Sequence, residues 1–161
     1  MFYFRKANTT DLSSIMNIIS EAQQFLKEHG INQWQDGYPS EDVIALDIEN
    51  QIAYVLLDEG RIVATVAIDP NGEEAYNDLE GGHWLSQGQY LAIHRLAVLP
   101  TYNGNGLATI IIQEVEKLCT EKQIHSLRLD THMENKAMQR VAEKNHFTKC
   151  GIVYYDGSPR I

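Results

Sequence analysis

Apolar residues recur at helical spacing in the first part of the chain. From residue 12 to residue 26 they stand three or four positions apart, which places them on one face of an α-helix. Thr9, Thr10 and Asp11 precede this stretch and carry side-chain oxygens that suit a helix N-terminus, and Gly30 follows it. The apolar face consists of Leu12, Ile15, Met16, Ile19, Ala22, Phe25 and Leu26.

The rest of the chain alternates between strand-like and helical patterns. Runs of β-branched and aromatic residues predict strands, and the remaining periodic stretches predict helices. Residues 71–88 have neither pattern, since they are polar, acidic and glycine-bearing, and they predict an irregular excursion. The predicted strands are 2–5, two runs on either side of Asp58–Arg61 within 53–68, 90–99, 126–132 and a C-terminal stretch in 147–157, and the predicted helices are 41–49, 107–122 and 135–145.

The order of these elements predicts an α/β fold. In the second half, helices connect successive strands, which favours parallel pairing, while the hairpin in the first half is antiparallel. We therefore expect a mixed sheet with helices on both faces. The 161 residues suit one domain, residues 1–161, with one core.

Composition excludes several classes of function. The net charge of −9 disfavours nucleic acid as a partner; it agrees with a cationic amine substrate, and equally with a plain gain in solubility. No apolar stretch is long enough to span a membrane and the N-terminus has no signal-peptide pattern, so we expect a cytoplasmic protein. Asp130 and His132 lack a third ligand, so no metal site is predicted.

A glycine turn opens the helix at 107–122. The sequence TYNGNGLATIII at residues 101–112 places Gly104 and Gly106 directly before that helix. The first N–H groups of a helix are unpaired and carry partial positive charge, so such a turn either simply starts a helix or binds a phosphate. The residues do not fit a nucleotide P-loop, which ends in Gly-Lys-Ser/Thr, or a dinucleotide fingerprint with three glycines.

Two motifs give the chain a resemblance to a known family. The segment LAVLPTYNGNGLA at 96–108 resembles the strand, V-x-P step and Q/R-x-x-G-x-G/A turn of the GCN5-related N-acetyltransferase (GNAT) superfamily. The segment 135–147 is similar to the family's N-x-x-A-x-x-x-Y-x-x-x-G-F helix, with the same spacing from Asn to Phe. The resemblance implies a mostly antiparallel sheet in which two parallel central strands splay apart as a V.

The same resemblance implies acetyl-CoA as cosubstrate, lying between the strands at 90–99 and 126–131. Backbone groups of β-strand residues would pair with its pantetheine arm, and amides of the glycine turn would hold its pyrophosphate. Asn135 would lie beside the pantetheine, and it also suits a helix N-cap. The implied cofactor-binding residues are Leu96, Ala97, Val98, Asn103, Gly104, Asn105, Gly106, Leu107, Ala108, Asn135 and Met138.

Three residues depart from the family pattern. Asn103 replaces the usual Gln or Arg, and His146 replaces the glycine before Phe147. Ala142 stands where many members carry the tyrosine that protonates the departing thiolate, so the general acid is unassigned. This last departure keeps open a non-catalytic acyl-CoA-binding or regulatory module as the alternative function.

The implied reaction is direct attack of an amine on the thioester in a ternary complex. His94 is the candidate base, because its ordinary pKa is near neutrality and strand alternation would put it on the face of Leu96 and Val98; the alternative is a structural, hydrogen-bonded histidine. Tyr154, or its neighbour Tyr155, would replace the missing tyrosine if it points into the cleft.

The acceptor is predicted to be a primary amine of a small molecule or peptide. The resemblance places an acceptor pocket in the loop that carries Trp34 and Tyr38, and Trp84 lies in the acidic excursion with Glu73 and Glu74. Aromatic and acidic side chains suit a cationic amine, and the alternative is that the aromatics belong to the core. A homodimer is left open.

Overall fold

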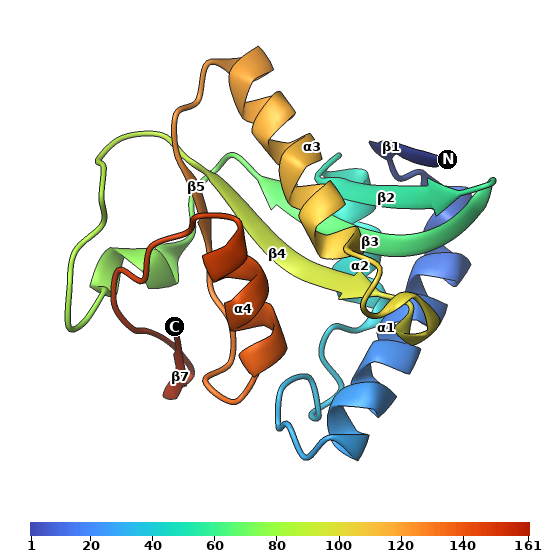
Figure 1. Ribbon diagram of the computed structural model, residues 1–161, viewed down its shortest axis with the longest axis horizontal. Helices are drawn as coiled ribbons and strands as arrows, with labels where there is room; N and C mark the ends of the chain where they lie inside the picture. The colour runs from blue at the N-terminus through green and yellow to red at the C-terminus, as the bar shows by residue number, and fades with distance from the viewer.

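The computed structural model describes residues 1–161 as a five-stranded sheet covered by helices on both sides, with a separate two-stranded hairpin near the C-terminus (Figure 1). The strand order is β1-β2-β3-β4-β5, with β4 and β5 parallel and all other neighbours antiparallel. The predicted mixed, mostly antiparallel sheet is therefore confirmed. The strands are β1 Phe2–Lys6, β2 Ala53–Asp58, β3 Arg61–Asp69, β4 Leu91–Val98 and β5 Leu127–Leu129.

The helices lie close to where the apolar periodicity places them. In Figure 1, α3 crosses the near side of the strands and α2 lies behind them. The apolar stripe of α1 is buried at Ile15, Ile18 and Ile19, and α3 buries Ile111 and Ile112. Together with the strands these residues form one core that holds the sheet between its two helical layers. The helices are α1 Leu12–Glu28, α2 Glu41–Glu49, α3 Leu107–Lys122 and α4 Lys136–Lys144.

The parallel strands β4 and β5 separate after a short paired stretch. Pairing runs from Leu91 and Leu127 to Ile93 and Leu129, and β4 then continues without a partner on that side. The predicted strand at 126–132 is thus shorter than expected. Beyond it, the chain pairs with the C-terminal hairpin of β6 (Val153–Tyr155) and β7 (Ser158–Arg160), since Thr131 and Ile161 exchange backbone hydrogen bonds of 2.9 and 3.0 Å. The result is the V-shaped splay that the family resemblance implies.

The acidic excursion at 71–88 is irregular, as predicted, and is fixed to the sheet by aromatic contacts. The Arg128 guanidinium of β5 lies between the rings of Trp84 and Tyr90, 4.2 and 4.0 Å from their centroids. It also donates to the Ser86 carbonyl at 2.8 Å. Tyr76, in a short 3₁₀ turn, is buried beneath this layer. No helix in the chain has the length and apolar character needed to cross a membrane.

Candidate active site

A β-bulge interrupts β4 where it leaves β5. Ala97 lies opposite Thr65 and His94 lies opposite Ala67, so Arg95 and Leu96 together face the single residue Val66. Arg95 has φ +52°, a left-handed conformation that is uncommon for a residue with a Cβ. The extra residue reverses the alternation. The prediction that His94 shares the face of Leu96 and Val98 is therefore wrong, and His94 instead shares the face of Ala92 and Ala97.

The bulge also decides which amides of β4 face the gap. The Leu91 amide donates to Ser126 on the β5 side, whereas the Leu99 amide, although also odd-numbered, donates to Val63 on the β3 side. Because backbone groups alternate along a strand, the amides of Leu96 and Val98 turn toward the side that β5 has left. These are two of the residues that the sequence assigns to acetyl-CoA.

The glycine turn presents unpaired backbone amides. Gly104 and Gly106 have φ +85° and +75°, so the turn uses the left-handed conformation that glycine favours. The amides of Gly104, Gly106, Leu107, Ala108 and Thr109 have no hydrogen-bond acceptor among the chain's own groups, and α3 has no side-chain cap. In contrast, Ser40 caps α2 and Asn135 caps α4. Asn103 and Asn105 are exposed, and their amides bond the carbonyls of Pro100 and Tyr102.

Helix α4 carries the second motif. The Asn135 oxygen accepts from the Met138 amide at 3.1 Å, so its N-cap role is confirmed, and its Nδ2 donates to Gln33 at 2.8 Å. Ala142 provides no hydroxyl at the position where many family members carry a tyrosine. His146 has φ +69°, and it occupies in left-handed conformation the place where the family has glycine.

His94 lies in a cluster of polar side chains on the face of the sheet reached by the excursion. Its side chain is 11% exposed, and its Nε2 has no hydrogen-bond partner. The nearest charged atom is Oε2 of Glu73, 3.5 Å away, and the side chain of Glu73 is 27% exposed. The Tyr76 ring packs on the imidazole at a centroid distance of 6.2 Å. The cluster therefore contains one unsatisfied imidazole nitrogen beside a carboxylate that solvent can reach.

Asp130 completes this cluster from the β5 side. Both Tyr76 and Tyr155 donate their hydroxyl hydrogens to its Oδ2, at 2.7 and 3.2 Å. Tyr154, by contrast, is 44% exposed, and the nearby Glu80 carboxylate raises its pKa. Of the two tyrosines at the end of the chain, Tyr155 is therefore the one that reaches the cluster.

Burial shifts the proton equilibria of the cluster. Burial, with the Arg95 charge, lowers the pKa of His94, although Asp130, Glu73 and Asp69 oppose this shift. His94 is therefore neutral at physiological pH and can accept a proton. Burial and the Asp130 charge raise the pKa values of Tyr76 and Tyr155. Both tyrosines keep their protons and act as hydrogen-bond donors.

Replacing Asp130 by asparagine should lower the free energy of unfolding by about 1–3 kcal/mol, because two partly buried hydroxyls lose a charged acceptor. The tyrosine pKa values should fall, since the negative charge that raises them is gone. Denaturant unfolding and ultraviolet titration of the tyrosines measure the two effects. Asp78→Asn, an exposed change in the same excursion, is the control. An Asp130→Asn protein with wild-type stability and titration would contradict this description of the cluster.

The three aromatic residues predicted to bind the acceptor amine have different surroundings. Trp84 donates its indole N–H to the Tyr76 carbonyl at 2.9 Å, and its ring face is covered by Arg128, so that face is not free for a substrate cation. Trp34 packs against the main core. Tyr38 is 41% exposed, and its hydroxyl accepts from Arg95 at 2.9 Å. Of the three, Tyr38 is the aromatic with both an exposed ring and a contact to the bulge.

Sequence patterns did not identify Tyr76 or Asp47 as site residues. Tyr76 is one residue of a polar excursion, and nothing local indicates that its hydroxyl meets Asp130. The sequence gives no reason to separate Asp47 from the other polar residues of α2. Its carboxylate nevertheless binds Arg95 of the bulge. In both cases the partner is far away in the sequence.

Two surface hollows of the chain lie away from the fork, which is the gap where β4 and β5 separate. These hollows, of about 520 and 470 Å³, include neither His94 nor the glycine turn. No group of three or more His, Cys, Asp or Glu side chains is arranged to hold a metal ion. The groups able to take part in chemistry are the polar cluster around His94 and the unpaired backbone amides of β4 and of the N-terminus of α3.

Comparisons with known proteins agree with this geometry. A GNAT-family structure from Streptococcus agalactiae is 33% identical, with a TM-score of 0.88 and coverage of 99% of this chain and 92% of the other. One from Listeria monocytogenes is 26% identical, with a TM-score of 0.77 and the same coverages. The PaiA N-acetyltransferase of Thermoplasma acidophilum, in complex with coenzyme A, shares the fold at 18% identity, with a TM-score of 0.72 and coverage of 99% and 96%.

The sequence profile of the family covers most of the chain. The profile described as "Acetyltransferase (GNAT) family" matches residues 13–147, which include β4, the glycine turn and α4. No curated protein sequence matches the chain. The motifs, the splayed strands and the profile agree, and the chain belongs to the GNAT family of acetyltransferases.

Proposed function

We propose that this chain transfers the acetyl group of acetyl-CoA to the primary amine of a cationic small molecule or peptide, at the fork between β4 and β5. Membership of the family gives the reaction class, with acetyl-CoA as cosubstrate. The observation that carries the placement is His94, whose Nε2 is buried without a partner beside Glu73 at this fork.

Each of the two segments with free amides binds a different part of acetyl-CoA. The amides at Gly104 and from Gly106 to Thr109 hold the pyrophosphate, where the positive end of α3 adds to the attraction. The amides of Leu96 and Val98 extend along the pantetheine arm in the way that an added strand would. The thioester then lies at the bulge, and an amide directed at its developing oxyanion contributes about 3 kcal/mol.

The acidic side of the cluster receives the amine. A primary ammonium is attracted by the Glu73 carboxylate, which solvent can reach. Attack needs the neutral amine, so one proton must leave. Glu73 passes it to Nε2 of His94, which is neutral because burial lowers its pKa. The imidazolium that forms lies near the carboxylates of Glu73 and Asp130, which favour its charge.

The reaction does not require a tyrosine at position 142. The carbonyl carbon gains the bond to the amine nitrogen and loses the bond to sulfur, and coenzyme A leaves as a thiolate. The nitrogen releases its second proton to solvent as the amide forms. A thiol has a pKa of about 8.5, so its anion is a good leaving group near neutrality. Tyr155 donates its hydroxyl to Asp130 and has a raised pKa, so its role is to hold Asp130 rather than to protonate sulfur.

The acceptor class is tested by measuring the release of coenzyme A with a panel of amines. Diamines, lysine-containing peptides and amino sugars represent cationic acceptors, and monoamines with anionic groups are the comparison. We expect cationic acceptors to have the higher kcat/KM. Glu73→Gln should reduce that preference by about tenfold, as loss of one charge contact predicts, while the exposed Glu74→Gln leaves it unchanged. Equal rates for cationic and anionic amines would contradict the proposed acceptor class.

A further inference from the structure

The side chain of the bulge residue Arg95 is anchored on α2. Its Nε and one Nη donate to the two carboxylate oxygens of Asp47, at 2.7 and 2.8 Å. Its other Nη donates to the Tyr38 hydroxyl at 2.9 Å. The Arg95 and Asp47 side chains are 16% and 8% exposed, so the pair is shielded from solvent. Every guanidinium nitrogen therefore has a partner, and the paired fork fixes the orientation of the side chain.

This anchor acts on a backbone conformation that the residue would otherwise avoid. A left-handed φ places the Cβ of an ordinary residue close to backbone atoms, so Arg95 at φ +52° needs an external restraint. Without the bulge, β4 would alternate regularly from Leu91 to Leu99. The amides of Leu96 and Val98 would then turn toward β3, away from the gap.

The third partner links the bulge to the loop between α1 and α2. Tyr38 lies in this loop, and its carbonyl accepts from Gln23 of α1 at 3.0 Å. Its hydroxyl shares the guanidinium of Arg95 with Asp47. A ligand that displaces the loop between α1 and α2 therefore acts directly on Arg95, the residue that forms the bulge.

We propose that Asp47 and Arg95 are a positioning pair that holds the bulge of β4, so that the Leu96 amide faces the thioester, and that Tyr38 connects the α1–α2 loop to this pair. The inference rests on the proposed function, because it takes the acetyl group to lie at the bulge. Neither side chain touches the reacting atoms in this arrangement. Both act through the backbone of β4.

The test uses acetyl-CoA carrying ¹³C at the acetyl carbonyl, followed by NMR on the full chain. A hydrogen bond from an amide moves this resonance downfield, so binding to the wild-type protein should shift it. Asp47→Asn removes the charge with almost no change of shape. Arg95→Lys keeps the charge but loses the two parallel N–H donors of the guanidinium. In both variants the shift should fall to about half or less, while the Kd for 3′-phospho-ADP, the part of coenzyme A that lacks the pantetheine arm, stays within about twofold, because the pyrophosphate site is untouched.

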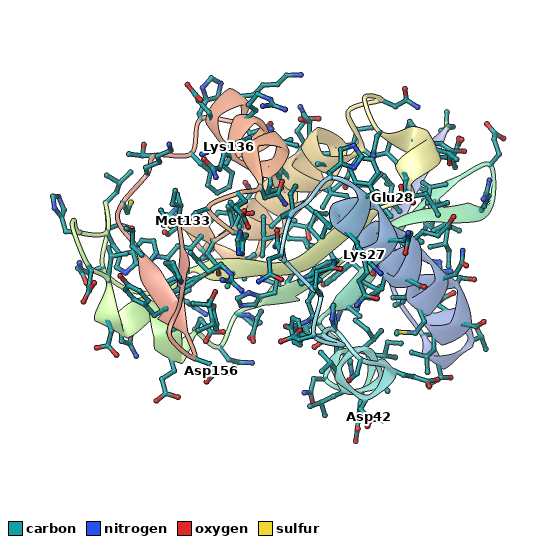
Figure 2. All side chains as sticks on the ribbon, turned by 90° about the horizontal axis from the view of Figure 1, so that it is seen from below. Lys27, Glu28, Asp42, Met133, Lys136 and Asp156 are labelled. Atoms are coloured by element: carbon teal, nitrogen blue, oxygen red, sulfur yellow. The ribbon has the colours of Figure 1, made fainter.

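Asp42→Asn is the matched control, since it makes the same chemical change at an exposed position of the same helix, at the outer edge of the molecule (Figure 2). It should keep the full carbonyl shift. Full shifts in Asp47→Asn and Arg95→Lys would overturn the inference and leave the proposed function standing. No shift in the wild-type protein would show that the thioester is not at the bulge, and both would fall. If Asp47→Asn does not unfold cooperatively, Arg95→Lys decides.

Discussion

Gly106→Glu should weaken acetyl-CoA binding by at least about a hundredfold, because it places a carboxylate at the N-terminus of α3, where we propose that the pyrophosphate binds. Two like charges about 4 Å apart repel by about 4 kcal/mol at an effective dielectric constant of 20, which exceeds the loss that a hundredfold requires. A Cβ built on Gly106 meets no atom within 4 Å, so steric overlap does not contribute. Isothermal titration with acetyl-CoA measures the effect.

The backbone conformation of Gly106 requires a matched control. Its φ of +75° is strained for any residue with a side chain, and that strain alone can lower the affinity. Asparagine tolerates this conformation better than most residues and carries no charge. Gly106→Asn should therefore bind acetyl-CoA within about tenfold of the wild-type protein. Equal losses in the two variants would assign the effect to the backbone, and an unchanged affinity in Gly106→Glu would remove the pyrophosphate from this turn.

His94→Ala should reduce kcat/KM at neutral pH by about a hundredfold to ten-thousandfold, the range that a positioned base supplies. The loss should shrink as the pH rises, because amines with a pKa of about 10.4 lose their proton to solvent in alkaline conditions. His125→Ala, at an exposed position outside the cluster, is the control. A loss that is the same at every pH would assign His94 a packing role.

The wild-type pH profile carries a related signature of His94. Its pKa is lowered in the folded protein, chiefly by burial, so the base remains active down to a pH below the ordinary value of about 6.5. Activity should fall only as the pH drops through that lowered pKa. Over the same window the unfolded chain binds more protons than the folded one, so stability also falls as the pH falls. His94→Ala should lack both the activity transition at that pKa and the accompanying loss of stability, and its activity should follow the ionisation of the amine alone.

The parts of the fold and site that depend on local sequence could be predicted. The stripe of α1 has helical spacing over many residues, and the glycines before α3 have the positive φ values that their residue type suggests. The α2 helix begins and ends at Glu41 and Glu49, as predicted from its composition, and the structure adds Ser40 as its N-cap. In each case the determining contacts lie within a few residues of one another.

The features that the sequence did not reveal depend on contacts between distant residues. Arg95 has a positive φ and its guanidinium is bound by Asp47 on α2, and no local pattern predicts a bulge at an arginine. That bulge reversed the expected face of His94. The neighbours of His94 likewise come from the excursion and from the segment that follows β5, so its surroundings depend on the assembled sheet. Strand alternation is reliable only where a strand is regular.

A crystal structure of the chain with acetyl-CoA tests the central claim most directly. We expect the pyrophosphate oxygens within hydrogen-bond distance of the amides of Gly104, Gly106, Leu107 and Ala108, and the acetyl carbonyl directed at the Leu96 amide. The acetyl carbon should lie on the side of the gap that Glu73 and His94 approach. A pyrophosphate bound elsewhere, or an acetyl group outside the fork between β4 and β5, would contradict the account.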